Sequence, residues 1–243
     1  MIPESINHRR KRKIGIVAGS GPEAGIDLWK KILDASRRTQ GKQFHGDMDA
    51  PDVTVFSIPE LGRSLDLEKN EEQVWAILES NLRQLAQRVD IICIACHTLH
   101  YFDKRIVKLR LPSEFVSMVD SVTKYIRNNR ISKLAILGTC DVMDLGTWSP
   151  YKALQRNVKI EKPDCRRTHQ LVLRIKQLGS EDPSIKPILE SILADLNSEV
   201  VLLACTELSL VHVQAPKKYL IDGTLLLAND VVKLSLTMDG SIK

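Results

Sequence analysis

Two segments of the chain are near copies of one another, and this duplication strongly limits how the chain can fold. They are residues 90–98 (DIICIACHT) and residues 199–207 (EVVLLACTE). Each begins with an acid, continues through an apolar run of strand length and reaches Ala-Cys, with a Thr within two residues. A second pair of similar segments, residues 13–20 (KIGIVAGS) and 133–139 (KLAILGT), opens each half of the chain. The chain is therefore predicted to contain two related α/β halves.

Strand-like and helix-like segments alternate along both halves. Strands are expected at 14–18, 53–58, up to 96, near 115–119, at 134–137, at 158–160 and up to 205. Helices are expected at 22–38, 67–88, near 101–109, up to 129, at 167–178, 184–197 and 225–236, the last of which is expected to return to the first half. This alternation is typical of parallel sheets covered by helices.

The fold class expected is α/β, with two similar domains that each contain a parallel sheet flanked by helices and are related by pseudo-twofold symmetry. Residues 13–112 together with 222–243 are expected to form the first domain, and residues 113–221 the second. Residues 1–12 are expected to be a basic N-terminal tail.

Most of the net positive charge lies in the N-terminal segment up to residue 13. The net charge of the 243 residues is +5, and the segment from Glu4 to Lys13 contributes four of these charges, so the body is nearly neutral. No nucleic-acid surface is implied, and the basic run at 8–13 is expected to be a solvated tail without function. No apolar stretch is long enough to span a bilayer, and the N-terminus lacks the apolar segment of a signal peptide. A soluble, cytoplasmic protein that does not bind membranes is therefore expected.

The five cysteines are odd in number, and three of them lie in or at the end of apolar runs. A cytosolic setting keeps thiols reduced, so free thiols rather than disulfides are expected. Residues 93–97 (CIACH) match the c-type haem attachment pattern, but that attachment needs export and a loop context. A zinc site with His100 is disfavoured because residues three apart on a strand face opposite sides, and no metal site is expected. Cys93 lies inside the predicted strand, which disfavours a thioredoxin-like pair and favours core packing.

A glycine-rich turn at residues 19–24 (GSGPEA) follows the first strand and resembles the dinucleotide fingerprint. The acid expected about twenty residues further on is missing. Two interpretations remain: a tight connection that presents backbone N–H groups to a small anion, or a purely structural turn.

Cys96 and Cys205 are the strongest candidates for chemistry. They lie at the carboxyl ends of strands, where open α/β sheets bind ligands. A thiol that ends a strand and begins a helix is expected to have a lowered pKa because the helix dipole stabilises the thiolate. A matched pair of such thiols indicates acid/base chemistry on two sides of a substrate.

These motifs resemble those of the aspartate/glutamate racemase superfamily, with the aspartate racemase branch most similar. The two signature segments are similar to residues 94–100 (IACHTLH) and 204–208 (ACTEL). The family's first glycine-rich turn resembles residues 19–22, its second resembles 137–139 (LGT), and the segment before its last helix resembles 221–224 (IDGT). The resemblance extends from about residue 13 to residue 236.

The resemblance implies an amino-acid racemase that uses no PLP or other cofactor, with the active site between two α/β domains, and a homodimer. One thiolate of the pair Cys96 and Cys205 would remove the α-proton of the substrate while the opposite thiol donates from the other face. Hydroxyl and amide groups beside each cysteine would hold the α-carboxylate of the substrate, and this role carries over to Thr98, Thr139 and Thr206. Ser20 and His97 are further candidates for substrate binding. Closure of the domains would supply the dry site that the carbanion requires.

Two positions depart from the family pattern. His97 stands where the family usually has Asn, and Val142 where it usually has Thr. A titratable, bulkier imidazole could reshape the carboxylate pocket. Arg63 is the candidate for holding the side-chain carboxylate of aspartate, with a surface arginine as the alternative. Glutamate, broad-specificity and hydantoin racemases stay open as functions, as does a catalytically inactive protein that binds a small amino or dicarboxylic acid.

Overall fold

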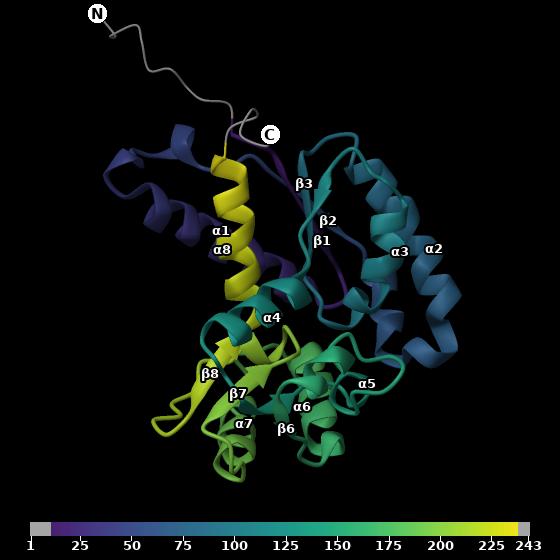
Figure 1. Cartoon of the computed structure of the whole chain (residues 1–243), viewed down its shortest axis with the longest axis vertical. Coiled ribbons are helices and arrows are strands. Elements are labelled where there is room, and N and C mark those ends of the chain that lie inside the picture. The colour runs from purple at the N-terminus through teal and green to yellow at the C-terminus, as the bar shows by residue number, and fades with distance from the viewer. Residues whose placement is uncertain (1–10, 238–243) are drawn as a thin grey trace, which may run out of the picture.

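The computed structural model describes residues 11–237, which form two α/β domains stacked along the long axis of the molecule (Figure 1). The first domain contains a four-stranded parallel sheet in the order β2-β1-β3-β4. Its strands are β1 (Ile14–Ala18), β2 (Val53–Ser57), β3 (Ile91–Ile94) and β4 (Glu114–Phe115). Its helices are α1 (Pro22–Gln40), α2 (Leu67–Leu85) and α3 (Asp103–Lys108), with 3-10 turns η1 (Gly41–Gln43), η2 (Asp47–Asp49), η3 (Pro59–Asp66) and η4 (Thr98–Phe102).

The second domain repeats this arrangement with a parallel sheet in the order β6-β5-β7-β8. Its strands are β5 (Lys133–Leu137), β6 (Lys159–Glu161), β7 (Val200–Leu203) and β8 (Tyr219–Asp222). The remaining helices are α4 (Met118–Asn128), α5 (Cys140–Met143), α6 (Cys165–Leu178), α7 (Ile185–Ala194) and α8 (Gly223–Leu236), with turns η5 (Lys152–Arg156) and η6 (Leu208–Leu210). The matching strand orders confirm the prediction of two similar domains.

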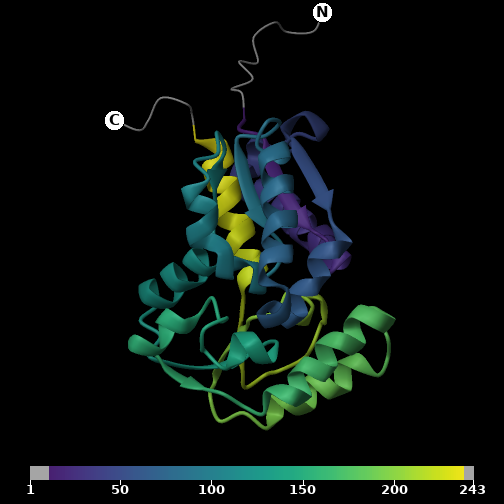
Figure 2. The same cartoon turned by 90° about the vertical axis from the view of Figure 1, so that its right-hand side faces the viewer.

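Each sheet is buried on both faces because helices cover both sides. Every residue of β1 and β3 is buried, which explains why both strands are continuous apolar runs. One face of the first sheet packs against α2 and the other against α1 and α8. α8 follows β8 of the second sheet but returns to lie beside α1, as Figure 2 shows with α8 in yellow above the lower domain. The predicted return of the last helix is thus observed.

The domain borders differ slightly from those expected. β4 pairs with β3, so the first sheet continues beyond the expected border at residue 112. Residues 1–10 of the expected tail lie outside the described residues. Lys11 and Arg12 are not a solvated tail: Lys11 donates to the carbonyl of Asp49, and Arg12 forms a 2.9 Å ion pair with Glu114.

The expectation that all cysteines are free is wrong. Cys140 and Cys165 form a disulfide, with their Cα atoms 5.0 Å apart. Each is the first residue of a helix, α5 or α6, and the packing of these two helices brings the cysteines together. Cys93, Cys96 and Cys205 are free and buried. Within residues 11–237, no helix is long and apolar enough to cross a membrane.

Candidate active site between the domains

Cys96 lies in the loop between β3 and η4, two residues after the strand ends. Its side chain is buried, and its Sγ donates to Oγ of Ser20 at 3.5 Å. Ser20 belongs to the glycine-rich turn after β1, and its Oγ also lies 3.0 Å from Oγ of Ser64 in η3. The turn requires glycine at position 19, where φ is +108° and a Cβ atom would lie 2.3 Å from the backbone of Ile58. Ser20 therefore contacts both the first thiol and Ser64.

Cys205 occupies the equivalent position after β7 in the second domain. Its Sγ donates to Oε2 of Glu207 at 2.9 Å, and Oγ1 of Thr206 donates to the same oxygen at 3.2 Å. Burial and the negative charge of Glu207 raise the pKa of Cys205 well above its ordinary value. The prediction that a helix dipole lowers the pKa of this thiol is therefore wrong. The turn that follows, η6, has only three residues, so its dipole is small compared with burial and the adjacent carboxylate.

Lys176, near the end of α6, forms an ion pair with Oε1 of Glu207, and both side chains are mostly buried. Burial opposes the charge of Lys176, but Glu207 and the thiols of Cys205 and Cys96 together raise its pKa. The lysine therefore lies within electrostatic range of both thiols, one from each domain. The domains meet at Gly21, where a Cβ atom would lie 2.1 Å from Oε1 of Glu207.

A cavity of about 410 Å³ opens beside this ion pair. The first domain contributes Gly19, Gly21 and Gly62 to its lining, and the second domain contributes Lys176 and Glu207. The volume suits a small molecule, and the combination of a largely apolar wall with a few charged groups is typical of ligand sites. Neither Cys96 nor Cys205 lines this cavity, but Glu207, which does, accepts the hydrogen bond of Cys205.

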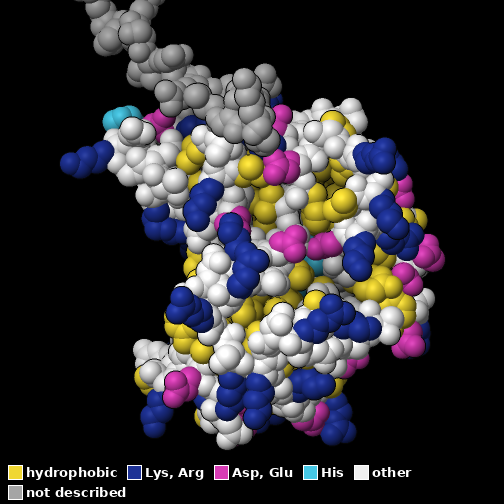
Figure 3. Space-filling view, viewed as in Figure 1, with side chains coloured by type: hydrophobic (Ala, Val, Ile, Leu, Met, Phe, Trp, Pro, Cys, Tyr) yellow, Lys and Arg dark blue, Asp and Glu magenta, His cyan; other side chains and the backbone are white. Residues whose placement is uncertain are grey.

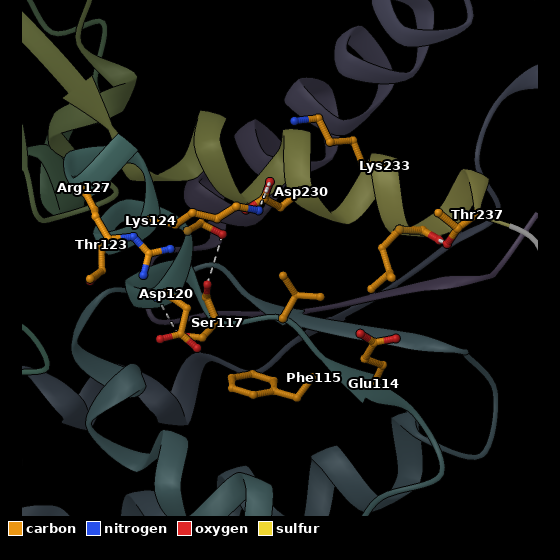
Figure 4. A pocket seen from close by; sticks show the side chains of 13 residues that line it. Glu114, Phe115, Ser117, Asp120, Thr123, Lys124, Arg127, Asp230, Lys233 and Thr237 are labelled. Carbon is orange, nitrogen blue, oxygen red and sulfur yellow. Dashed lines mark hydrogen bonds and ion pairs between the residues drawn. The ribbon is translucent and has the colours of Figure 1, made fainter. Parts of the chain in front are cut away.

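A larger cavity, of about 590 Å³, lies away from the thiols. It occupies the groove between β4, α4 and α8, where Figure 4 shows Ser117 and Asp120 on one side and Asp230 and Lys233 on α8. Figure 3 shows this face of the molecule, with acidic and basic side chains mixed around exposed hydrophobic atoms. None of the predicted site residues lines this groove, so it is not the candidate active site.

The three predicted threonines are all buried. Thr206 bonds to Glu207, whereas Oγ1 of Thr139 has no hydrogen-bond partner among the described residues. A buried hydroxyl without a partner costs free energy, so Thr139 is suited to receive a polar group of a ligand. Thr98 begins η4, directly beyond the Cys96 loop.

Two predicted residues lie differently from the others. Arg63 is exposed on η3. Its neighbour Gly62 lines the cavity, and its neighbour Ser64 is hydrogen-bonded to Ser20. The side chain of His97 is buried and is directed toward Tyr151 of the second domain, with Nδ1 2.7 Å from the hydroxyl. The site roles assigned to Arg63 and His97 stay predictions.

Sequence reasoning missed Glu207 and Lys176 as site residues. Glu207 had a detectable signal, because it is a carboxylate two residues after a candidate thiol in an otherwise apolar segment. Lys176 had none, because its position depends on how α6 packs against η6 and on the approach of the first domain.

Comparison with known proteins shows the family of the chain and relatives of its fold. Residues 17–231 match the family model of the Asp/Glu/Hydantoin racemases. The broad specificity amino-acid racemase RacX of Bacillus subtilis (strain 168) is 25% identical over an alignment of 234 residues that covers 92% of this chain and 98% of that protein. The fold resembles the Picrophilus torridus aspartate racemase (TM-score 0.74, 22% identity, 92% of this chain and 94% of that one). It also resembles an aspartate racemase homologue from Pyrococcus horikoshii OT3 (TM-score 0.69, 22% identity, 92% and 99%). The chain, whose family match covers most of its length, belongs to the Asp/Glu/Hydantoin racemase family of isomerases.

Proposed function

We propose that this protein is a cofactor-independent amino-acid racemase acting on aspartate or a related acidic amino acid, with Cys96 and Cys205 as its two bases. One thiolate removes the α-proton, and the opposite thiol donates a proton to the other face of Cα. The observation that carries this proposal is the pair of buried thiols at equivalent positions of two similar domains, the second of which is hydrogen-bonded to the carboxylate of the Glu207–Lys176 ion pair.

The two thiols differ in how a proton can leave them. Glu207 accepts a hydrogen bond from Cys205 at 2.9 Å, so the S–H proton can pass to Oε2 and leave a thiolate. This transfer makes Glu207 neutral and moves its negative charge to the thiolate, and Lys176, the ion-pair partner of Glu207, offsets that charge. Cys96 has the hydroxyl of Ser20 as its partner instead of a carboxylate.

Fixed hydrogen-bond donors replace a cofactor as the means of stabilising the carbanion. Without an electron sink, charge that develops at Cα must spread into the α-carboxylate, and donors in a dry site stabilise it there. Thr98, Thr139 and Thr206 are assigned to this carboxylate. Thr98 and Thr206 lie within two residues of a candidate thiol, and Thr139 lies in the turn after β5, which corresponds to the glycine-rich turn after β1. The unpartnered Oγ1 of Thr139 supports the assignment.

An acidic substrate is favoured by the cation at the cavity. Lys176 lines the cavity and would accept a second substrate carboxylate as partner in competition with Glu207. That exchange would free Glu207 to act on Cys205. Similarity to an aspartate racemase and to a broad-specificity racemase is compatible with this assignment.

The direct test is to incubate the purified protein with each L-amino acid and to follow loss of chirality. Aspartate is expected to racemise fastest, and a chelator is expected to leave the rate unchanged because the proposed bases are thiols. Faster racemisation of an apolar amino acid or a hydantoin would overturn the acidic substrate. Tight binding of aspartate without exchange of its α-proton would indicate the inactive binding protein.

Replacing Glu207 by glutamine is expected to lower the pKa of Cys205, so that alkylation of this thiol begins at lower pH. Burial and the Glu207 carboxylate raise the pKa of this thiol, and removing the negative charge lowers it again while Lys176 stays beside the thiolate. In a Cys96→Ser background, the pH profile of alkylation by iodoacetamide reports Cys205. Glu23→Gln serves as the control, since Glu23 lines the same cavity but has no described hydrogen bond to a thiol. If the alkylation profile of Cys205 in Glu207→Gln stays in place or moves to higher pH, the Glu207 carboxylate does not raise the pKa of this thiol.

A further inference from the structure

A tyrosine of the second domain is hydrogen-bonded to the residue that follows Cys96. Tyr151 is fully buried, and its hydroxyl lies 2.7 Å from Nδ1 of His97. The two rings are 5.7 Å apart between centroids and tilted by 43°. Because His97 belongs to the loop after β3, this hydrogen bond joins the two domains beside one candidate catalytic thiol.

Tyr151 is held rigidly on its own domain. Its N–H donates to Oγ of Ser149 at 3.3 Å, and that Oγ donates to the carbonyl of Val142 at 2.6 Å. The N–H of Val142 bonds in turn to the carbonyl of Thr139 at 3.1 Å. The ring packs into the core formed by α4, α5 and the second sheet. The position of the Tyr151 hydroxyl therefore follows the position of the Thr139 turn.

The other side of the imidazole faces the points where the chain crosses between domains. A Cβ atom at Gly223 would lie 2.6 Å from Cε1 of His97 and 3.3 Å from Sδ of Met118. Met118 begins α4 and Gly223 begins α8, and these helices follow the two crossings. Nε2 of His97 is buried and has no hydrogen-bond partner among the described residues. The hydrogen bond to Tyr151 is thus the one described polar contact that orients this ring.

Both partners are neutral near physiological pH. Burial, with smaller effects of His100 and Lys31, lowers the pKa of His97 to about 3. Burial, with a smaller effect of Asp103, raises the pKa of Tyr151 well above its ordinary value. The hydrogen bond therefore does not depend on a charge on either partner.

We propose that Tyr151 is a positioning residue that sets the Cys96 loop relative to the second domain through its hydrogen bond to His97. This inference rests on the proposed racemase function. His97 stands between Cys96 and Thr98, so a displacement of its ring moves the thiol on one side and a candidate carboxylate-binding hydroxyl on the other. Cys205 is held by Glu207 within the second domain, and no described contact links it to His97. Loss of the Tyr151 hydroxyl is therefore expected to affect the half of the reaction that depends on Cys96.

The experiment uses Tyr151→Phe, which removes one oxygen and preserves the ring, and follows chloride release from each Cα enantiomer of 3-chloroaspartate. In this reaction one thiolate removes the α-proton, the electron pair forms a C=C bond, chloride leaves, and water then hydrolyses the product to oxaloacetate and ammonia. The variants Cys205→Ser and Cys96→Ser show which enantiomer uses which thiol. Tyr151→Phe is expected to slow elimination from the enantiomer served by Cys96 about tenfold or more, because small displacements of reacting groups cost rate steeply. Elimination served by Cys205 is expected to change less than about twofold.

Tyr125→Phe is the matched control, because its hydroxyl bonds to Tyr219 within the second domain. In a His97→Asn background, Tyr151→Phe is expected to have no further effect. The ¹⁵N signal of His97 Nδ1 is expected to move in Tyr151→Phe and to stay in place in Tyr125→Phe. If Tyr151→Phe slows chloride release from both enantiomers equally, or from neither, the positioning role of Tyr151 is overturned. The proposed racemase function still stands in that case, provided that the wild type racemises aspartate. A wild-type protein that neither racemises aspartate nor releases chloride would instead overturn the proposed function.

Discussion

Replacing Cys96 or Cys205 by serine is expected to lower racemisation in both directions by roughly 10²- to 10⁴-fold, the range over which a positioned acid or base contributes to rate. A serine hydroxyl is a far weaker acid than a thiol, so each variant lacks an effective base on one face and an effective donor for the reverse reaction. Chiral chromatography of aspartate gives the rates. In heavy water, each newly formed enantiomer made by the wild type is expected to carry deuterium at Cα, while unreacted substrate initially does not.

Cys93→Ala is the matched control for these variants. Cys93 is also a free, buried cysteine, but burial raises the pKa of its thiol to about 12, so it stays protonated and inert. Its Sγ donates to the carbonyl of Gly15 inside the first sheet. The two serine variants are also expected to eliminate chloride from opposite enantiomers of 3-chloroaspartate. Near-normal racemisation by either serine variant would show that its thiol is not a catalytic base.

Sequence alone predicted the parts of the fold that local patterns determine. The apolar runs of β1, β3, β5 and β7 are the central strands of the two sheets, where burial on both faces leaves no ambiguity. The weaker edge strands were harder to predict. β8 has one fully buried residue among its four, and β4 has only two residues, so neither carries a clear apolar period. The misplaced domain border follows directly from the short β4.

Contacts made only by tertiary packing could not be predicted. The disulfide depends on α5 and α6 beginning side by side, which no local pattern indicates for Cys140 and Cys165. The same is true of Lys176, which reaches Glu207 from the far end of α6. Ser20 was predicted only as a substrate-binding residue of the glycine-rich turn, and its 3.5 Å contact with Cys96 is a further finding of the structure.

Replacing Gly21 by alanine is expected to lower racemisation by roughly 10²-fold or more, because the reacting groups would be displaced by an ångström or so. The new Cβ atom would lie 2.1 Å from Oε1 of Glu207 and 3.1 Å from Nζ of Lys176, so the ion pair must move or the domains must separate. Either change takes Glu207 away from Cys205 and opens the site to water. Steady-state kinetics with aspartate, compared with the wild type, measure the loss in kcat and KM.

Gly41→Ala separates this clash from backbone strain. Gly41 also has a positive φ, of +53°, but a Cβ atom there meets nothing within 4 Å, whereas φ at Gly21 is +99°. The backbone conformations of both glycines (φ/ψ of +99°/+94° at Gly21 and +53°/−123° at Gly41) are ones that L-residues rarely adopt, so alanine costs about 1–3 kcal/mol at either position and both variants are expected to unfold at lower temperatures. Only Gly21→Ala is expected to lose racemisation, because only its methyl group reaches the charged pair between the domains. If the two variants racemise aspartate equally well, the contact between Gly21 and Glu207 does not assemble the active site, and the catalytic role of Glu207 fails with it.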